Sequence, residues 1–311
     1  MDDQVKDNLC YHYTSLDTFI NILNVANAHN FTFWASSIFS MNDPMEMKWG
    51  YEKIFDMLPS IEKELGVVDP VYQLSRLWDK DVSHSKEELS NFFIECHDIS
   101  FLHPFVISLS QTRDSLPIWG MYGGNGTGVA LGFDLRLYYI ELEQEGGCRR
   151  FDITHINFDD IHAIDMEYDT LEKFKTCYGI VRSDYHKYWE SVCGITDGKE
   201  IAQRQLKALS SMIMYAAPFI KHNAYRYEKE SRIIKFHESI TDIKFRTNAK
   251  GTIIPYLEVP IPTSALKEII IGPCCNFNLI KKSLEIILLQ KGIKTDDIEI
   301  TPSSQPYRNN Y

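Results

Sequence analysis

The chain has 311 residues, 44% of them hydrophobic and 13% aromatic, which supports a substantial core and excludes wholesale disorder. Its formal net charge of −11 gives no overall positive field, so a contact with nucleic acid would depend on a local basic patch. The seven cysteines lack zinc-type spacing, and no apolar run approaches the ~18 residues of a membrane span.

The first third of the chain predicts two strands separated by a helix. Residues 9–14 are rich in β-formers, and Ser15 can cap a helix whose apolar residues recur at helical spacing. A second strand is expected at Asn30–Ala35, followed by a loop from Ser36 to Pro44. Two further helices are expected, at 45–65 and 85–97.

The middle of the chain predicts a strand, a short helix, a glycine-rich turn and a second strand. These elements are expected at Phe105–Ser110, Ser115–Tyr122, Gly123–Gly128 and Val129–Phe133. The following segment, residues 138–215, alternates acidic loops with two or three helices, the last at about 198–216.

The C-terminal third predicts strands at 225–236, 253–259 and 267–272, a helix at 277–291 and a final strand at 298–300. Strands and helices are mixed without strict alternation, which favours an α+β fold over a doubly wound sheet. We therefore expect one domain over residues 1–311, with a helical insertion at about 138–215.

A pair of carboxylates begins the strand expected at 225–236. Side chains alternate along a strand, so Glu228 and Glu230 would share one face and Lys229 would point to the other. Two like charges on one face repel each other unless a function uses them. Carboxylates suit chemistry on a sugar, where they stabilise an oxocarbenium ion or accept a hydroxyl proton. The alternative interpretation is a solvated edge strand.

The first strand carries a histidine and a hydroxyl on one face. His12 and Thr14 can both hydrogen-bond to the vicinal hydroxyls of a ribose, whereas Tyr13 lies opposite. A structural role for this pattern is the alternative. The segment Gly123–Gly128 lacks a phosphate-loop ending and precedes a strand, so it predicts a turn or a mobile lid. The segment 42–46 holds carboxylates in one turn, which suits helix capping better than a metal ion.

At these residues the chain resembles the ADP-ribosyltransferase superfamily of the His-Tyr-Glu type. The order is the same: a strand with H-x-T, a helix, a second strand ending in Ala-Ser-Ser, and a late strand with E-x-E. The chain also looks like an uncharacterised bacterial domain family over nearly its full length. The recurring pieces of that family are here Tyr11–Thr14, Phe39–Glu46, Trp119–Tyr122, Gly128–Asp134 and Tyr227–Arg232.

The first resemblance implies an ADP-ribosyltransferase-like split β-sheet core that encloses NAD. Carried over, it makes Glu230 the catalytic glutamate, with Glu228 beside it to orient or deprotonate the acceptor. His12 and Thr14 would bind the adenosine ribose. The aromatic residue that stacks on nicotinamide has three candidates, Trp34, Trp119 and Tyr122. The full set implied to bind the cofactor is His12, Tyr13, Thr14, Ser36, Trp119, Tyr122 and Arg232.

The resemblance further implies an NAD-dependent ADP-ribosyltransferase, a bacterial toxin or antiphage effector that modifies RNA, DNA or protein. Eight basic residues against four acidic ones between Lys221 and Lys250 favour RNA. An NAD glycohydrolase and a non-enzymatic interaction module of a toxin–antitoxin or defence system are the alternatives. An antitoxin is an expected partner. No secretory leader is visible after Met1, so we expect a cytoplasmic protein with reduced thiols, no membrane partner and no metal.

Three structural expectations follow. His12 and Glu230 should line one cavity. Trp119 and Tyr122, three positions apart, should face the same way on a lid over the cofactor, with core packing of both as the alternative. Neutralising Glu228 or Glu230 should leave the fold intact, because it relieves their repulsion.

Overall fold

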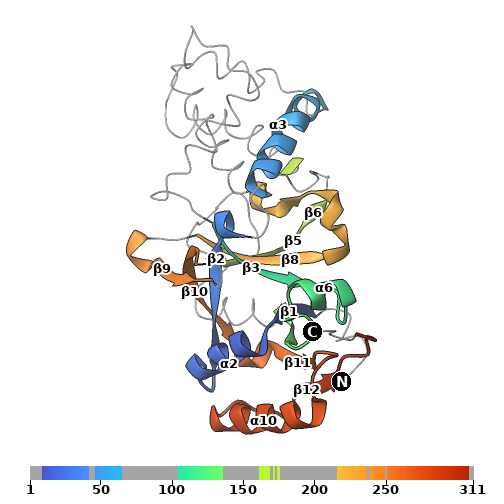
Figure 1. Ribbon diagram of the computed structural model, residues 1–311. Coiled ribbons are helices and arrows are strands. Elements are labelled where there is room, and N and C mark those ends of the chain that lie inside the picture. The colour runs from blue at the N-terminus through green and yellow to red at the C-terminus, as the bar shows by residue number, and fades with distance from the viewer. Residues whose placement is uncertain are drawn as a thin grey trace.

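The computed structural model describes residues 9–41, 46–64, 104–135, 161–168, 171, 174–175, 216–236, 239–248 and 251–307. These residues form a mixed structure around a ten-stranded, mostly antiparallel sheet (Figure 1), which confirms the predicted α+β class. None of the helices in these ranges is long and apolar enough to cross a membrane.

The N-terminal elements are β1 (Cys10–Thr14), α2 (Leu16–Val25), β2 (Asn30–Ser37), η1 (Ile38–Ser40), α3 (Glu46–Glu64), β3 (Pro104–Ser110), α6 (Leu116–Met121) and β4 (Val129–Phe133). The next are β5 (Ile161–Asp165), β6 (Glu167–Tyr168), η3 (Ala217–Phe219), β7 (Ile220–Lys221), η4 (Asn223–Glu228) and β8 (Glu230–Phe236). The last are η5 (Ile240–Asp242), β9 (Lys244–Thr247), β10 (Ile253–Pro262), η6 (Thr263–Ala265), β11 (Leu266–Ile271), α10 (Phe277–Gln290) and β12 (Glu299–Pro302).

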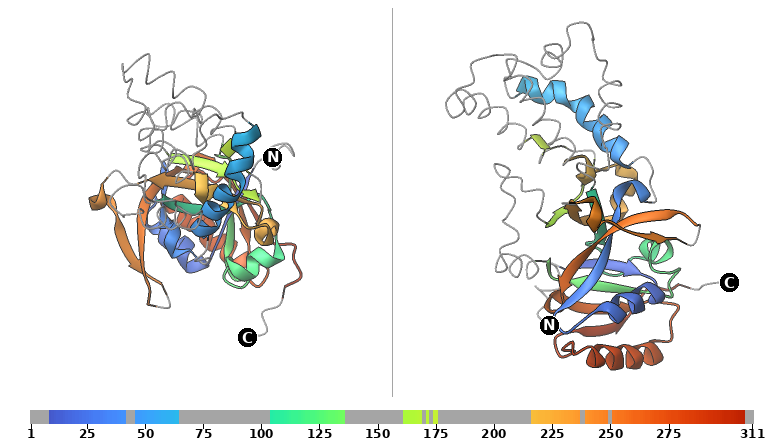
Figure 2. Two further views of the ribbon diagram at one scale, coloured as in Figure 1. Left: turned by 90° about the horizontal axis from the view of Figure 1, so that it is seen from above. Right: turned by 90° about the vertical axis from the view of Figure 1, so that its left-hand side faces the viewer.

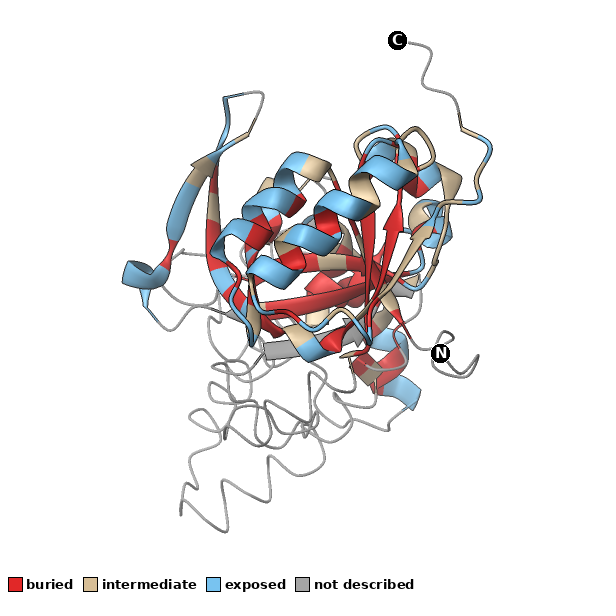
Figure 3. Cartoon of the chain, turned by 90° about the horizontal axis from the view of Figure 1, so that it is seen from below, coloured by how far each residue is buried: buried red, intermediate tan, exposed pale blue. Residues whose placement is uncertain are grey.

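The helix cap expected at Ser15 is formed as the sequence predicts. Ser15 accepts a hydrogen bond from the backbone N–H of Thr18 at 3.2 Å and begins α2. Helices α2 and α10 cover one face of the sheet (Figure 3), where Phe19, Leu23 and Leu288 are fully buried in the main core. Helix α6 packs on the other face through Ile118 and Trp119.

The sheet opens at β3. One edge of β3 pairs along its whole length with β8. On its other edge, β1 meets β3 only at Ser110, whereas β2 meets it only at Val106 and Phe105. Strands β1 and β2 therefore diverge from each other along this edge, and the middle of β3 has no strand partner there. This opening positions the site.

Some expected elements differ from the structure. Strand β2 continues to Ser37, two residues beyond its expected end. The strand expected from residue 225 begins only at Glu230, because residues 223–228 form the 3-10 helix η4. Strand β5 lies in the expected helical insertion and pairs with β8. The helix expected at 85–97 and most of the insertion at 138–215 lie outside the described residues.

Of the two predictions for Gly123–Gly128, a turn or a mobile lid, the turn is confirmed. The backbone N–H of Cys274 donates to the carbonyl of Gly126, and that of Gly272 donates to the carbonyl of Gly128, both at 2.9 Å. A Cβ atom on Gly128 would lie 2.1 Å from the carbonyl oxygen of Thr14, so only glycine allows this close approach. The segment is a turn fastened to the end of β11.

Candidate functional site

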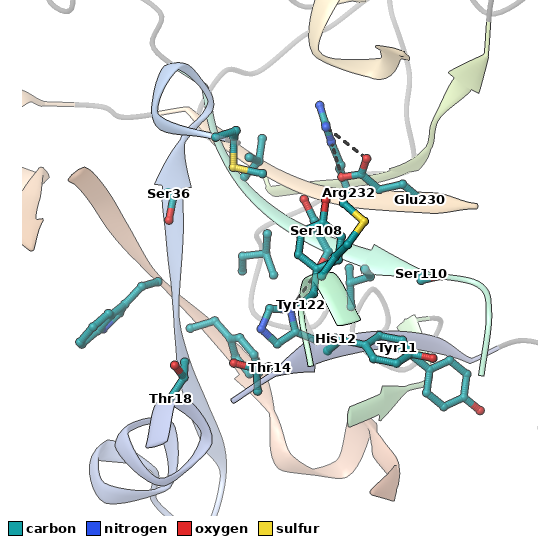
Figure 4. A pocket seen from close by; sticks show the side chains of 18 of the residues that line it. Tyr11, His12, Thr14, Thr18, Ser36, Ser108, Ser110, Tyr122, Glu230 and Arg232 are labelled. Atoms are coloured by element: carbon teal, nitrogen blue, oxygen red, sulfur yellow. Dashed lines mark hydrogen bonds and ion pairs between the residues drawn. The ribbon is translucent and has the colours of Figure 1, made fainter. Parts of the chain in front are cut away.

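A cavity of about 660 Å³ occupies the opening between β1, β2 and β3. This is the size of a typical small-molecule or cofactor site. The predicted residues that line it are His12, Tyr13, Thr14, Ser36, Tyr122, Glu228, Glu230 and Arg232. His12 and Glu230, distant in sequence, therefore share one cavity as expected (Figure 4).

Alternation along β1 divides its side chains between the cavity and the core. His12 projects into the cavity, and Tyr11 points away from it (Figure 4). The hydroxyl of Tyr13 donates to the carbonyl of Thr112 at 2.9 Å, and its ring packs edge-on against Trp119 with centroids 4.9 Å apart. Tyr13 thus contributes to the cavity wall, but its side chain is committed to the core.

Ser108 in the middle of β3 fixes the histidine ring. Ser108 has no strand partner on the edge of β3 that faces β1 and β2, and its carbonyl oxygen is 3.0 Å from Nδ1 of His12. Burial lowers the pKa of His12, so the ring is neutral near pH 7. A neutral ring that bonds to a carbonyl must carry its proton on Nδ1, which leaves Nε2 as a hydrogen-bond acceptor. The side-chain oxygen of Ser108 is buried and has no hydrogen-bond partner among the residues that the structure describes.

The two carboxylates converge, but not because they alternate along one strand. Glu228 ends η4, and Lys229 then adopts a left-handed conformation with φ of 41° before β8 begins. Lys221 bridges the pair, with Nζ at 2.6 Å from Oε2 of Glu228 and 2.5 Å from Oε2 of Glu230. The predicted strand geometry at Glu228 is wrong, although both side chains do reach one place.

Two buried cations balance the two buried carboxylates. Arg232, on the same face of β8 as Glu230, donates from Nε to Oε1 at 2.8 Å and from Nη2 to Oε2 at 3.2 Å. Burial alone would raise the pKa of Glu230, but the charges of Arg232 and Lys221 outweigh it and hold the pKa at about 2. Glu230 is therefore ionised near pH 7, even though only 4% of its surface is exposed.

The two aromatic candidates at α6, Trp119 within the helix and Tyr122 at its C-cap, have different roles. Trp119 is fully buried, donates from Nε1 to Asp114 at 2.7 Å and does not line the cavity, so its prediction as a cofactor-binding residue is wrong. Tyr122 lines the cavity, and its hydroxyl donates to Oε1 of Glu228 at 3.0 Å. Burial, followed by the charge of Glu228, raises the pKa of Tyr122, so the phenol keeps its proton.

Sequence reasoning missed three residues of this site. Lys221 appeared only as part of a basic patch, although a lysine directly after the apolar run Ala216–Ile220 is a signal for a buried ion pair. Arg246 was likewise counted only in that patch, and Ser108 gave no signal, because the place of each depends on a partner from another strand. Ser36, which was predicted, accepts a hydrogen bond from Nη2 of Arg246 at 3.0 Å.

The segment 42–45 lies outside the described residues. Among the residues that the structure does describe, no group of three His, Cys, Asp or Glu side chains could hold a metal ion.

A family described as protein of unknown function (DUF2971) matches residues 118–233 of the chain. The matched segment contains Tyr122, Lys221 and the carboxylates, whereas His12 and Ser36 precede it. No curated protein and no solved structure matches the chain.

Proposed function

We propose that the protein is an NAD-dependent ADP-ribosyltransferase that acts as a bacterial toxin or antiphage effector in the cytoplasm. The observation that carries the proposal is the single cavity lined by His12, Glu228 and Glu230. In the ADP-ribosyltransferase-like split core that the sequence resembles, the first-strand histidine and the late glutamate hold the two riboses of NAD. The opening of the sheet at β3 is consistent with such a core.

The protonation state of His12 favours a ligand hydroxyl. A neutral imidazole with its proton committed to Ser108 offers only an acceptor at Nε2. A ribose hydroxyl can donate to that atom, whereas an ionised phosphate cannot. His12 is therefore suited to a sugar rather than to the pyrophosphate of the dinucleotide.

The carboxylates suit cleavage of the bond between nicotinamide and ribose. The leaving group is already cationic, so the reaction needs no general acid. It needs an anion that stabilises the developing oxocarbenium ion, and Glu230 stays ionised. A carboxylate accepts about four hydrogen bonds. Glu230 receives one on Oε1, which leaves that atom able to accept from a ribose hydroxyl.

Glu228 can accept more additional hydrogen bonds than Glu230 can. The structure gives it one partner on each oxygen, Tyr122 on Oε1 and Lys221 on Oε2. It is therefore suited to orient or deprotonate the acceptor. We keep RNA and protein as the acceptor classes, with an antitoxin as a further partner. Of the eight basic residues nearby, Lys221 and Arg232 are buried in ion pairs and cannot attract a nucleic acid.

One observation favours a second function, a non-enzymatic interaction module. Both oxygens of Glu230 are held by cations, as they would be in a purely structural ion network. In that case Glu230 would hold β7 against β8 and the cavity would bind a ligand without reaction.

The proposal is tested with labelled NAD and separate pools of RNA, DNA and protein. We expect the label on one pool, and release of free ADP-ribose without an acceptor would indicate a glycohydrolase instead. Glu230→Gln keeps the side-chain size but loses about 3–4 kcal/mol of transition-state stabilisation, which slows the reaction about 10²–10³-fold.

Glu268→Gln is the matched control. Glu268 is also a buried carboxylate held by an arginine, Arg113, but it does not line the cavity. Each variant removes the charge of a buried carboxylate from its ion pair. The rates are compared at a temperature below the unfolding temperatures of both variants. Equal activity of the two variants would show that Glu230 is structural, and the interaction module would then replace the transferase.

A further inference from the structure

One face of the β2–β10–β9 part of the sheet forms a wall of the cavity. Cross-strand register pairs Trp34 with Glu258, Ser36 with Tyr256, and Arg246 with Ile254. Residues two apart share a face, so these six side chains lie on the same side. Trp34, Ser36, Arg246 and Ile254 all line the cavity. The β9–β10 hairpin projects from the side of the sheet (Figure 2).

Trp34 presents an aromatic surface at this wall. Its side chain is 40% exposed although it lies on an interior strand of the sheet. Its ring is tilted by 33° to that of Tyr256, with centroids 4.8 Å apart. Tyr256, buried beneath it, supports the indole and holds it in place. A supported indole that is open to a cavity is a stacking platform for a planar ring.

Arg246 presents an uncompensated positive charge at the same wall. Its Nη2 donates to Ser36, and its Nε is buried with no hydrogen-bond partner in the described part of the chain. No carboxylate among the described residues forms an ion pair with it. Lys244, two residues earlier on the same strand, is by contrast neutralised by Glu258 at 2.7 Å and does not line the cavity. A guanidinium with free donors is suited to a phosphate group.

We propose that this wall is a nucleotide-binding subsite, in which Trp34 stacks on the base and Arg246 binds the phosphate. The two groups recognised, a planar ring and an anion, occur together in nucleotides. The subsite itself rests on the wall geometry alone, and only the source of its nucleotide rests on the proposed function. That source is either the ADP half of NAD or a nucleotide of a single-stranded nucleic-acid acceptor.

A ligand series measured by calorimetry tests the proposal. The ligands are adenosine, ADP and inorganic pyrophosphate, and the variants are Trp34→Ala and Arg246→Met. Trp34→Ala removes the stacking platform, so it should weaken the binding of adenosine and of ADP about tenfold. It should leave the affinity for pyrophosphate unchanged. Arg246→Met removes the guanidinium, so it should weaken the binding of ADP and of pyrophosphate by a similar factor. It should leave the affinity for adenosine unchanged.

Matched controls come from the same hairpin. Phe245→Ala removes an aromatic ring that is 65% exposed on the opposite face, and Lys244→Met removes the neutralised cation. Neither should change the affinity for ADP. If Trp34→Ala and Arg246→Met affect ADP no more than these controls do, the subsite proposal is overturned.

Two further ligands distinguish the sources. If NAD competes with ADP and a single-stranded RNA tetramer does not, the dinucleotide occupies the subsite. If the tetramer binds, competes with ADP and loses affinity in both variants, the acceptor occupies it. If both variants weaken the binding of ADP but the unmodified protein does not turn over NAD, the subsite proposal stands and the proposed function fails. If the protein turns over NAD but neither variant changes the KM for NAD, and neither variant weakens binding of the tetramer, the subsite proposal is overturned. The proposed function then stands.

Discussion

At the scale of single residues, the buried charges determine what substitutions in the cavity do. The sequence suggested that Glu228 and Glu230 repel each other and that neutralising either would leave the fold intact. In the structure Lys221 and Arg232 compensate both, so that expectation is wrong. Removing one partner of a buried ion pair costs about 3–5 kcal/mol. Because the folded pKa of Glu230 lies below its ordinary value of 4.5, its stabilisation is complete above that pH and is lost as the pH falls toward about 2.

His12 gives the clearest residue-level prediction. In His12→Asn, the amide N–H₂ can replace Nδ1 and still donate to the carbonyl of Ser108, but no acceptor remains at the position of Nε2. We expect nearly unchanged stability and up to tenfold weaker NAD binding, the value of about one hydrogen bond. Titration of NAD by calorimetry and a thermal unfolding curve measure the two effects.

His12→Gln is the complementary variant. Its carbonyl can reach the position of Nε2, so it should bind NAD more tightly than the asparagine variant does. Burial lowers the pKa of His12, so affinity for NAD should be constant between about pH 6.5 and 8. A loss of affinity centred near pH 6.5 would show that the ring titrates in the folded protein and would contradict the assigned tautomer.

At the scale of elements, the sequence predicted most strands and missed the turn that builds the site. Alternating β-formers in Tyr225-Arg226-Tyr227 favoured a strand, but residues 223–228 form η4. The reversal depends on a positive φ at Lys229, and lysine gives no sequence signal for this conformation. Strand β5 was missed because it is five residues long and its place beside β8 is set by tertiary pairing.

The turn at Lys229 makes an element-level prediction. Glycine adopts a φ of 41° without strain, so Lys229→Gly should be neutral or stabilise the fold by up to about 1 kcal/mol. Proline cannot adopt it and removes the N–H that donates to the carbonyl of Arg226. Lys229→Pro should therefore destabilise the protein by about 3 kcal/mol or more.

Urea unfolding and NAD binding together check this prediction. The proline variant should also lose NAD affinity, because Glu228 and Glu230 would no longer converge on Lys221. A proline variant with normal stability and affinity would show that the left-handed turn is not required for the site.

At the scale of the whole molecule, the sheet interleaves strands from both ends of the chain. Strand β1 pairs with β4, β4 pairs with β11, and β11 pairs with β12, so the cavity wall at His12 depends on C-terminal strands. The sequence predicted these four strands. It could not indicate their order in the sheet, because pairing joins residues that lie far apart in the sequence, such as Tyr11 with Ser110 and Ser36 with Val106. The opening at β3, and therefore the cavity, was unpredictable for the same reason.

The segment after β12 contacts residues on either side of α6, in the middle of the chain. Asp114, just before α6, accepts hydrogen bonds from the hydroxyl of Ser303 at 2.8 Å and from the backbone N–H of Ser304 at 2.7 Å. Burial tends to raise the pKa of Asp114, but these bonds and the one from Trp119 lower it below its ordinary value. Tyr307 lies against Gly126, where a Cβ atom would come within 2.7 Å of its ring.

Ending the chain at Pro302 removes these contacts and should destabilise the protein. Hydrogen bonds to a charged group contribute about 1.5–3 kcal/mol each and are not additive, so we expect a loss of about 2–4 kcal/mol. The control ends the chain at Tyr307, which keeps the contacts of Asp114 and Tyr307 described above. Urea unfolding should separate the two proteins at pH 7, and the difference should shrink as the pH falls below 3.8, where Asp114 accepts a proton in the unfolded chain. Equal midpoints at pH 7 would mean that the C-terminal segment rests on the sheet without stabilising it.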